Sequence, residues 1–207
     1  MKYESLIFDI DGTLWDSTDL VAEGYNIQLK REGLNHLMVT GPQLKSLFGK
    51  IMTEIADVIF ASIPVPERYD LMERCMDTEN KYLYENPCKI GYPGVKETME
   101  ELSKNYRLFI VSNSQCGYPE LCIQKLGLEN CISGHMCFGD TGTEKGETIR
   151  RLMERHDIEN AAYIGDTQGD LDATIVAGIP FIFASYGFGN PTHWDRKIDK
   201  IEDLLVN

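Results

Sequence analysis

The sequence is poor in positive charge and has no long apolar run. Its 20 lysine and arginine residues are outnumbered by 33 aspartate and glutamate residues, which gives a formal net charge of −13. Such an acidic surface repels nucleic acids and anionic membranes. No window approaches the roughly 20 consecutive apolar residues that a transmembrane helix needs. We therefore expect no nucleic-acid partner and no membrane association.

Metal-binding cysteine pairs and a signal peptide are also missing. The six cysteines form no Cys-x-x-Cys pair, which disfavours a zinc site or a thioredoxin-type centre and favours reduced structural thiols. The N-terminal apolar stretch, residues 6–10, is too short and too acidic for a signal peptide because it contains Asp9. A cytoplasmic location is the resulting expectation.

Four short apolar runs predict the buried strands of a parallel sheet. Each run is almost continuously apolar, as expected for a sheet that is covered on both faces. The runs are residues 6–8, 108–111, 161–164 and 181–184, with a weaker fifth candidate at residues 135–138.

Apolar residues at helical spacing lie between these runs. Residues 95–102 and 147–156 each place apolar side chains on one helical face. Leu171, Ile175 and Val176 are predicted to form another such face, which ends at a C-cap at Gly178. The alternation of strand and helix predicts an α/β, doubly wound, Rossmann-like core.

A long segment after the first strand interrupts this alternation. Residues 16–90 have helical spacing, are punctuated by prolines and contain no convincing strand. We interpret them as a small all-helical domain inserted after the first strand. The core domain then comprises residues 1–15 and 91–207.

Polar residues lie directly after three of the predicted strands, at the sheet edge where open α/β folds bind ligands. The first strand ends in Asp-Ile-Asp-Gly-Thr at residues 9–13, and the second ends in Ser112-Asn113. The strand at 161–164 ends in Gly-Asp-Thr-Gln-Gly-Asp at residues 165–170, and Lys145 opens the helix before it. These groups are expected to converge on one crevice.

This order of motifs resembles that of the haloacid dehalogenase-like (HAD) hydrolase superfamily. Residues 9–17 are similar to its first motif, Ser112 to the second, Lys145 to the third and residues 165–170 to the fourth. The inserted segment is similar to the helical cap of phosphoglycolate phosphatase-like members. The resemblance implies a Mg²⁺-dependent phosphatase that acts on a small phosphorylated metabolite through an aspartyl-phosphate intermediate.

The motif residues have chemically distinct expected roles. Asp9 is the expected nucleophile, and Asp11 is the expected general acid and base. Mg²⁺ is expected between Asp9 and Asp166, and the resemblance adds the Asp11 backbone carbonyl as a ligand. Asp170 is expected either to bind the metal or its waters, or to orient Lys145.

A second group of residues is expected to bind phosphate and substrate. The Ser112 hydroxyl and the Lys145 ammonium supply fixed donors to the phosphoryl oxygens. Lys50, in an expected loop of the inserted domain, either contacts an anionic group of the substrate or is a solvated surface lysine. The complete expected set is Gly12, Thr13, Ser112, Asn113, Lys145 and Lys50.

Several alternatives stay open at this stage. A sugar-phosphate mutase similar to β-phosphoglucomutase would use the same covalent chemistry, and a non-catalytic binding module could retain the fold. Asp11, at the acid–base position, favours the phosphatase. A second Gly-Asp-Thr at residues 139–141 precedes Lys145 and lacks an aspartate four residues after Asp140, so we do not assign it to the metal. Both a monomer and a small homo-oligomer are compatible with the sequence.

Overall fold

The computed structural model describes residues 3–206, and the chain divides into two compact units. One unit comprises Met1–Asp16 and Ile90–Asn207, and the other comprises Ser17–Lys89. These boundaries differ by one residue from those expected from the sequence. The chain leaves the first unit at Asp16 and returns to it at Ile90. These two residues are adjacent in space, since the Asp16 N–H donates to the Ile90 carbonyl at 3.0 Å.

The first unit is built on a six-stranded parallel sheet in the order β3-β2-β1-β4-β5-β6. In the centre, Phe8 of β1 lies opposite Ile110 of β2 and Ile164 of β4. The strand order reverses beside β1, so the carboxyl ends of the central strands form the expected ligand edge. The strands are β1 (Ser5–Phe8), β2 (Arg107–Ser112), β3 (Ile132–Cys137), β4 (Ala161–Gly165), β5 (Phe181–Ala184) and β6 (Arg196–Ile198).

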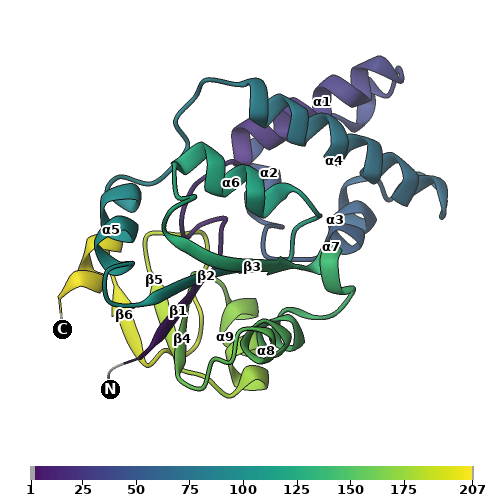
Figure 1. Cartoon of the computed structure of the whole chain (residues 1–207). Coiled ribbons are helices and arrows are strands. Elements are labelled where there is room, and N and C mark those ends of the chain that lie inside the picture. The colour runs from purple at the N-terminus through teal and green to yellow at the C-terminus, as the bar shows by residue number, and fades with distance from the viewer. Residues whose placement is uncertain (1–2, 207) are drawn as a thin grey trace. The chain divides into compact units, whose positions relative to one another are not determined.

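Helices cover both faces of this sheet, as a doubly wound fold requires. The crossover connections place α6 on one face and α8 and α9 on the other, which Figure 1 shows. Helix α8 packs on β2 and β3, and α9 packs on β4 and β5. The helices of this unit are α5 (Val95–Leu102), α6 (Tyr118–Leu126), α7 (Phe138–Thr141), α8 (Lys145–Arg155) and α9 (Gln168–Ala177), with a short 3₁₀ helix, η2 (Ile201–Leu205).

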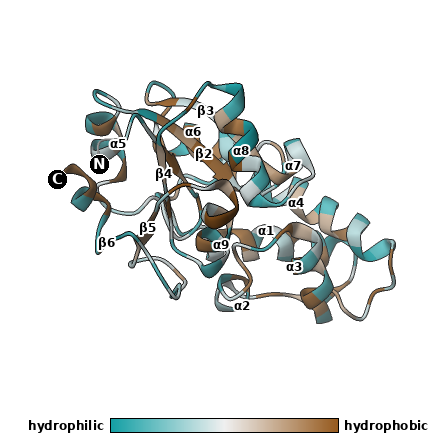
Figure 2. Cartoon of the chain, turned by 90° about the horizontal axis from the view of Figure 1, so that it is seen from below, coloured by the Kyte–Doolittle hydropathy of each residue, from teal (hydrophilic) through white to brown (hydrophobic). Residues whose placement is uncertain are grey.

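The core lies between the sheet and the layer of α8 and α9. Ile149 and Leu152 of α8 pack with Ile7, Phe109 and Tyr163 of the central strands, and all five side chains are fully buried. Figure 2 shows β2 in the brown of hydrophobic residues. The predicted doubly wound α/β fold is therefore confirmed, and its apolar runs are buried because both faces of the sheet are covered.

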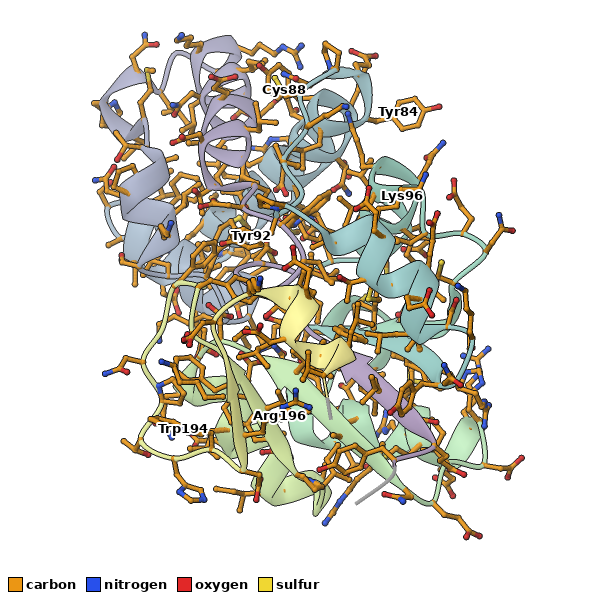
Figure 3. The ribbon with its side chains drawn as sticks, turned by 90° about the vertical axis from the view of Figure 1, so that its left-hand side faces the viewer. Tyr84, Cys88, Tyr92, Lys96, Trp194 and Arg196 are labelled. Atoms are coloured by element: carbon orange, nitrogen blue, oxygen red, sulfur yellow. The ribbon has the colours of Figure 1, made fainter. Side chains whose placement is uncertain are left out.

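The fifth strand candidate was wrong at its end, and the sixth strand was not predicted. Phe138 begins α7, because the Asp140 carboxylate accepts the Cys137 N–H at 2.9 Å and caps that helix. Strand β6 has no apolar run, since Ile198 is its one buried residue. Arg196, labelled in Figure 3, ties this edge strand to the end of η2 by donating to the carbonyls of Asp203 and Val206.

The predicted apolar face of the helix before Gly178 was also wrong. Ile175 and Val176 are 70% and 50% exposed, whereas Leu171, Ala173 and Thr174 are buried. Helix α9 approaches α8 closely at Gly146, where an added Cβ would lie 2.7 Å from the Val176 Cβ and 2.9 Å from the Ala173 carbonyl oxygen. Packing between two helices, rather than the hydrophobicity of single residues, therefore decides which face of α9 is covered.

All regular elements of the second unit are helical. Its longest helices, α1 and α4, pack along one another, with Val21, Tyr25 and Leu29 of α1 and Leu71 and Leu83 of α4 buried. No helix in the described part of the chain combines the length and apolarity that a membrane crossing requires. The elements are α1 (Thr18–Arg31), η1 (Asn35–Leu37), α2 (Gly41–Lys45), α3 (Met52–Ile59) and α4 (Glu67–Glu85).

Candidate active site

A buried lysine joins two carboxylates at the carboxyl edge of the sheet. Asp9 follows β1 directly, Lys145 is the first residue of α8, and Asp170 lies in the first turn of α9. The Lys145 Nζ donates to Asp9 Oδ1 at 2.9 Å and to Asp170 Oδ1 at 2.7 Å. None of the three side chains is more than 5% exposed, so this is a charged network shielded from solvent.

Hydrogen bonds hold both oxygens of the Asp170 carboxylate. Its Oδ2 accepts the backbone N–H groups of Asp166 and Thr167 at 3.1 and 2.9 Å, and the Thr167 hydroxyl at 2.7 Å. Thr167 is the N-cap of α9, and its Oγ accepts the Asp170 N–H in return. The capping box thus fixes Asp170 in the orientation in which its Oδ1 meets Lys145.

Asp166 is held at only one of its two oxygens. Its Oδ2 accepts the Phe188 N–H at 2.6 Å. Its Oδ1 is buried and has no hydrogen-bond partner among residues 3–206. Ligand atoms of Asp9, Asp166 and Asp170 all lie within 4.8 Å of one another. Burying a carboxylate oxygen without a hydrogen-bond partner costs free energy, so we expect a cation or a proton at this position.

The pKa values of the cluster reflect this crowding of negative charge. Burial raises the pKa of Asp9 to about 7, although the positive charge of Lys145 acts to lower it. Burial, with the charges of Asp170 and Asp9, raises the pKa of Asp166 to about 8. Burial acts on Asp170 in the same sense, but the Lys145 charge and the hydrogen bonds from Lys145 and Thr167 lower its pKa overall. Burial opposes the charged form of Lys145, yet Asp170 and Asp9 raise its pKa above the ordinary value.

The residues present fit a divalent cation. When all three carboxylates are ionised, they and the one ammonium leave two excess negative charges, which a divalent ion would balance. Oxygen donors of this kind suit Mg²⁺. Gly12 keeps the space beside Asp166 open: its φ is +83°, and a Cβ there would lie 2.2 Å from Asp166 Oδ2.

The Asp11 carboxyl group lies outside this cluster and has its own donors. The Trp15 indole N–H and the Tyr118 hydroxyl both donate to Asp11 Oδ1, each at 2.9 Å. Trp15 comes from the connection after β1, whereas Tyr118 opens α6 after β2. The two donors therefore reach the same oxygen from different parts of the sheet edge.

The predicted phosphate-binding residues come from both units. Ser112 ends β2, and its Oγ accepts the Ser114 N–H at 3.2 Å, in a connection that also contains Asn113. The Thr13 hydroxyl is buried without a hydrogen-bond partner in the described residues. Lys50 is exposed and belongs to the second unit, between α2 and α3, so its contact with substrate stays a prediction.

The loop after β5 also contacts the site, although no motif predicted it. The Tyr186 hydroxyl donates to the Thr13 carbonyl at 2.9 Å, and its ring packs edge-on against Tyr92, which Figure 3 labels. A Cβ at Gly187 would lie 2.4 Å from both the Asp166 Cβ and the Gly12 carbonyl oxygen. The signal that could have found this loop is Tyr-Gly-Phe-Gly at residues 186–189, one residue after a predicted strand and at the same sheet edge as the motifs.

The second Gly-Asp-Thr sequence belongs to a different group of residues. Asp140 accepts hydrogen bonds from the thiols of Cys137 and Cys116, with S–O distances of 3.1 and 3.6 Å. Burial and this carboxylate raise the pKa of both thiols, which keeps them protonated. Together with the capping of α7, these bonds account for the position of Asp140.

Comparisons with known proteins match the chain as a whole. A family model described as haloacid dehalogenase-like hydrolase matches residues 6–184. A phosphoglycolate phosphatase of Aquifex aeolicus is 29% identical over 88% of this chain and 85% of its own length. A 5'-nucleotidase of Pseudomonas aeruginosa is 24% identical over 99% of this chain and 96% of its own length. A haloacid dehalogenase-like family hydrolase from Streptococcus pneumoniae has a similar structure, with a TM-score of 0.81, 21% identity, and coverage of 98% of this chain and 97% of that protein.

Proposed function

Because the chain belongs to the haloacid dehalogenase-like hydrolase family, we propose that it is a phosphatase that removes phosphate from a small phosphorylated metabolite. One observation carries the proposal: Lys145 is buried between Asp9 and Asp170, next to a buried oxygen of Asp166 that has no hydrogen-bond partner among residues 3–206. A nucleophile, a fixed positive charge and a cation-binding position thus meet at one sheet edge. Phosphoryl transfer depends on this combination.

A Mg²⁺ ion would be held by the carboxylates of Asp9 and Asp166, with the Asp11 backbone carbonyl as a further ligand. When bound, the ion supplies positive charge that offsets the charge of the transferring phosphoryl group. Asp170 is assigned to orienting Lys145, because both of its oxygens already accept hydrogen bonds. The metal-ligand role, which the sequence left open for Asp170, receives less support from this arrangement.

The chain's own residues account for the covalent step. The Asp9 carboxylate attacks phosphorus and forms an aspartyl-phosphate, while Lys145 stabilises charge on the phosphoryl oxygens. Asp11 protonates the leaving oxygen and later accepts a proton from the water that hydrolyses the intermediate. The Ser112 hydroxyl and the amide of Asn113 bind the phosphoryl group during both steps.

The first substrate class to test is a small phosphate ester that carries a second anionic group. Phosphoglycolate phosphatases are among the relatives, and 2-phosphoglycolate belongs to this class. A nucleoside monophosphate is the next class, because a 5'-nucleotidase is also similar.

The decisive experiment is phosphate release from a panel of phosphorylated metabolites with Mg²⁺ present. We expect turnover of at least one phosphomonoester, and we expect Asp9→Asn to abolish it while the variant stays folded. If no ester is hydrolysed, or Asp9→Asn keeps full activity, the proposal fails.

Product analysis in the same panel separates the two alternatives. Isomerised sugar phosphate with little free phosphate would identify a mutase. A chain that turns over nothing and does not bind beryllofluoride with Mg²⁺ would be a binding module.

A further inference from the structure

We propose that Trp15 and Tyr118 are positioning residues that decide which oxygen of Asp11 carries the catalytic proton. This inference rests on the proposed function, in which Asp11 is the general acid and base. Its basis is the geometry of the two donors on Asp11 Oδ1, both at 2.9 Å. Trp15 is fully buried and Tyr118 is 2% exposed, so neither donor competes with bulk water.

The chemistry of the donors disfavours one of the two possible positions of the proton on Asp11. An indole N–H can only donate, so the oxygen that it meets must be an acceptor. A protonated carboxyl group has one carbonyl oxygen and one hydroxyl. Because the carbonyl oxygen is the stronger acceptor, two donors on Oδ1 favour the arrangement with the hydroxyl at Oδ2. The donor pair therefore directs the transferable proton to Oδ2 in every catalytic cycle.

The aromatic pair is also rigid, which favours a positioning role. The rings of Trp15 and Tyr118 pack edge-to-face with centroids 5.4 Å apart. Trp15 is further fixed by its backbone, because its carbonyl accepts the Gly12 N–H at 2.9 Å and it bridges to Gly91. The two donors thus cannot easily follow Asp11 if its side chain rotates.

Asp11 gives up one proton in the first step and regains one in the second. In the first step, the ester P–O bond breaks as Asp9 bonds to phosphorus, and the proton of Asp11 Oδ2 passes to the leaving oxygen. In the second step, Asp11 Oδ2 takes a proton from the attacking water as the bond between Asp9 and phosphorus breaks. Both side chains end as they began.

The test uses two aryl phosphates that differ in leaving group. p-Nitrophenolate leaves readily without a proton, whereas phenolate, which resembles tyrosinate with its pKa of about 10, needs one. We expect Tyr118→Phe to lower kcat/KM, which reports the first step alone, about tenfold for phenyl phosphate and less than about twofold for p-nitrophenyl phosphate. Trp15→Phe should also slow phenyl phosphate hydrolysis more than p-nitrophenyl phosphate hydrolysis. Thermal melting of each variant checks that it is folded.

Two comparisons make the result specific to Asp11. In an Asp11→Asn background, Tyr118→Phe should cause no further loss with phenyl phosphate, because the hydroxyl acts only through Asp11. Tyr186→Phe removes a hydroxyl that bonds to the Thr13 carbonyl instead, and should change both esters by the same factor.

Equal losses on both esters for Tyr118→Phe, or additive losses in the double variant, would overturn the inference and leave Tyr118 a purely structural residue. If the wild-type protein hydrolyses neither these esters nor any metabolite of the panel, the proposed function itself fails. The two failures are therefore distinguishable.

Discussion

Asp166 and Asp170 are both buried carboxylates of one cluster, yet their surroundings are opposite. Each oxygen of Asp170 accepts hydrogen bonds, whereas Asp166 Oδ1 has no hydrogen-bond partner in the part of the chain that the structure describes. A carboxylate that is saturated with donors has little capacity left for a metal. Asp166 is therefore the better metal ligand, and Asp170 is the better support for Lys145.

This difference predicts separate effects for two substitutions. Asp166→Asn should weaken Mg²⁺ binding more than Asp170→Asn, because it removes a charged ligand from the unpartnered position. Asp170→Asn should lower kcat about 10- to 100-fold, as expected when a supporting residue is lost. Calorimetric titration with Mg²⁺ and steady-state kinetics measure the two effects.

Asp172→Asn is the matched control, since it removes an exposed carboxylate from the same helix. It should change neither quantity appreciably. Equal loss of Mg²⁺ affinity in the variants at positions 166 and 170 would contradict the division of roles.

At the scale of elements, the site is formed by residues at the carboxyl ends of the strands. Asp9 follows β1, Ser112 ends β2, Asp166 follows β4, and the loop after β5 supplies Phe188. Parallel strands bring these ends to one edge regardless of their separation in sequence. The loop after β5 lies close against the site, since Gly187 has no room for a side chain beside Asp166.

Gly187→Ala should therefore disturb both stability and metal binding. The added Cβ would lie 2.4 Å from the Asp166 Cβ, so the loop or the carboxylate must move. We expect a loss of about 1–3 kcal/mol in the free energy of unfolding, together with weaker Mg²⁺ binding. Urea unfolding and calorimetric titration measure the two quantities.

Gly169→Ala provides the comparison at the same edge. The nearest atom to its added Cβ would be Thr167 Oγ1 at 3.6 Å, which is ordinary contact. Because alanine is favoured over glycine in a helix by about 0.5–1 kcal/mol, this variant should be as stable as the wild type or more so. A Gly187→Ala protein with wild-type stability and affinity would contradict the argument.

The elements that the sequence predicted well are those whose own residues determine their burial. Strands β1, β4 and β5 are entirely buried and, apart from Ser5, almost continuously apolar, so the runs at 6–8, 161–164 and 181–184 identified them. Strand β6 has one buried residue, and its Arg196 side chain bonds to the Val206 carbonyl, outside the strand. Its pairing depends on tertiary contacts, which no local pattern encodes.

The same distinction applies to the site. Asp9, Lys145, Asp166 and Asp170 stand in motifs of fixed spacing, and the structure brings all four together. Tyr118 belongs to no such motif, and its hydroxyl meets Asp11 across 107 positions of sequence. A partner of this kind can be identified only from the fold, which places α6 beside the connection after β1.

At the scale of the whole molecule, an acidic protein is proposed to act on anionic substrates. The formal net charge is −13, while the site relies on Lys145 and a metal ion for positive charge. Within a Debye length of the surface, which is about 10 Å at 0.1 M salt and about 30 Å at 0.01 M, the approach of a dianionic ester is governed by the whole charge distribution. Repulsion should therefore slow the encounter at low ionic strength.

Added salt should accordingly raise kcat/KM for a dianionic phosphate ester and leave kcat unchanged, because screening acts on the encounter and not on the buried cluster. The measurement compares kcat/KM at about 20 mM and 150 mM NaCl with Mg²⁺ held constant; at the higher salt the Debye length falls to about 8 Å. Phosphocholine, whose quaternary amine offsets part of the phosphate charge, should respond less. A fall in kcat/KM with salt would mean that the local field of the metal and Lys145 reaches beyond the acidic surface and attracts the substrate from solution.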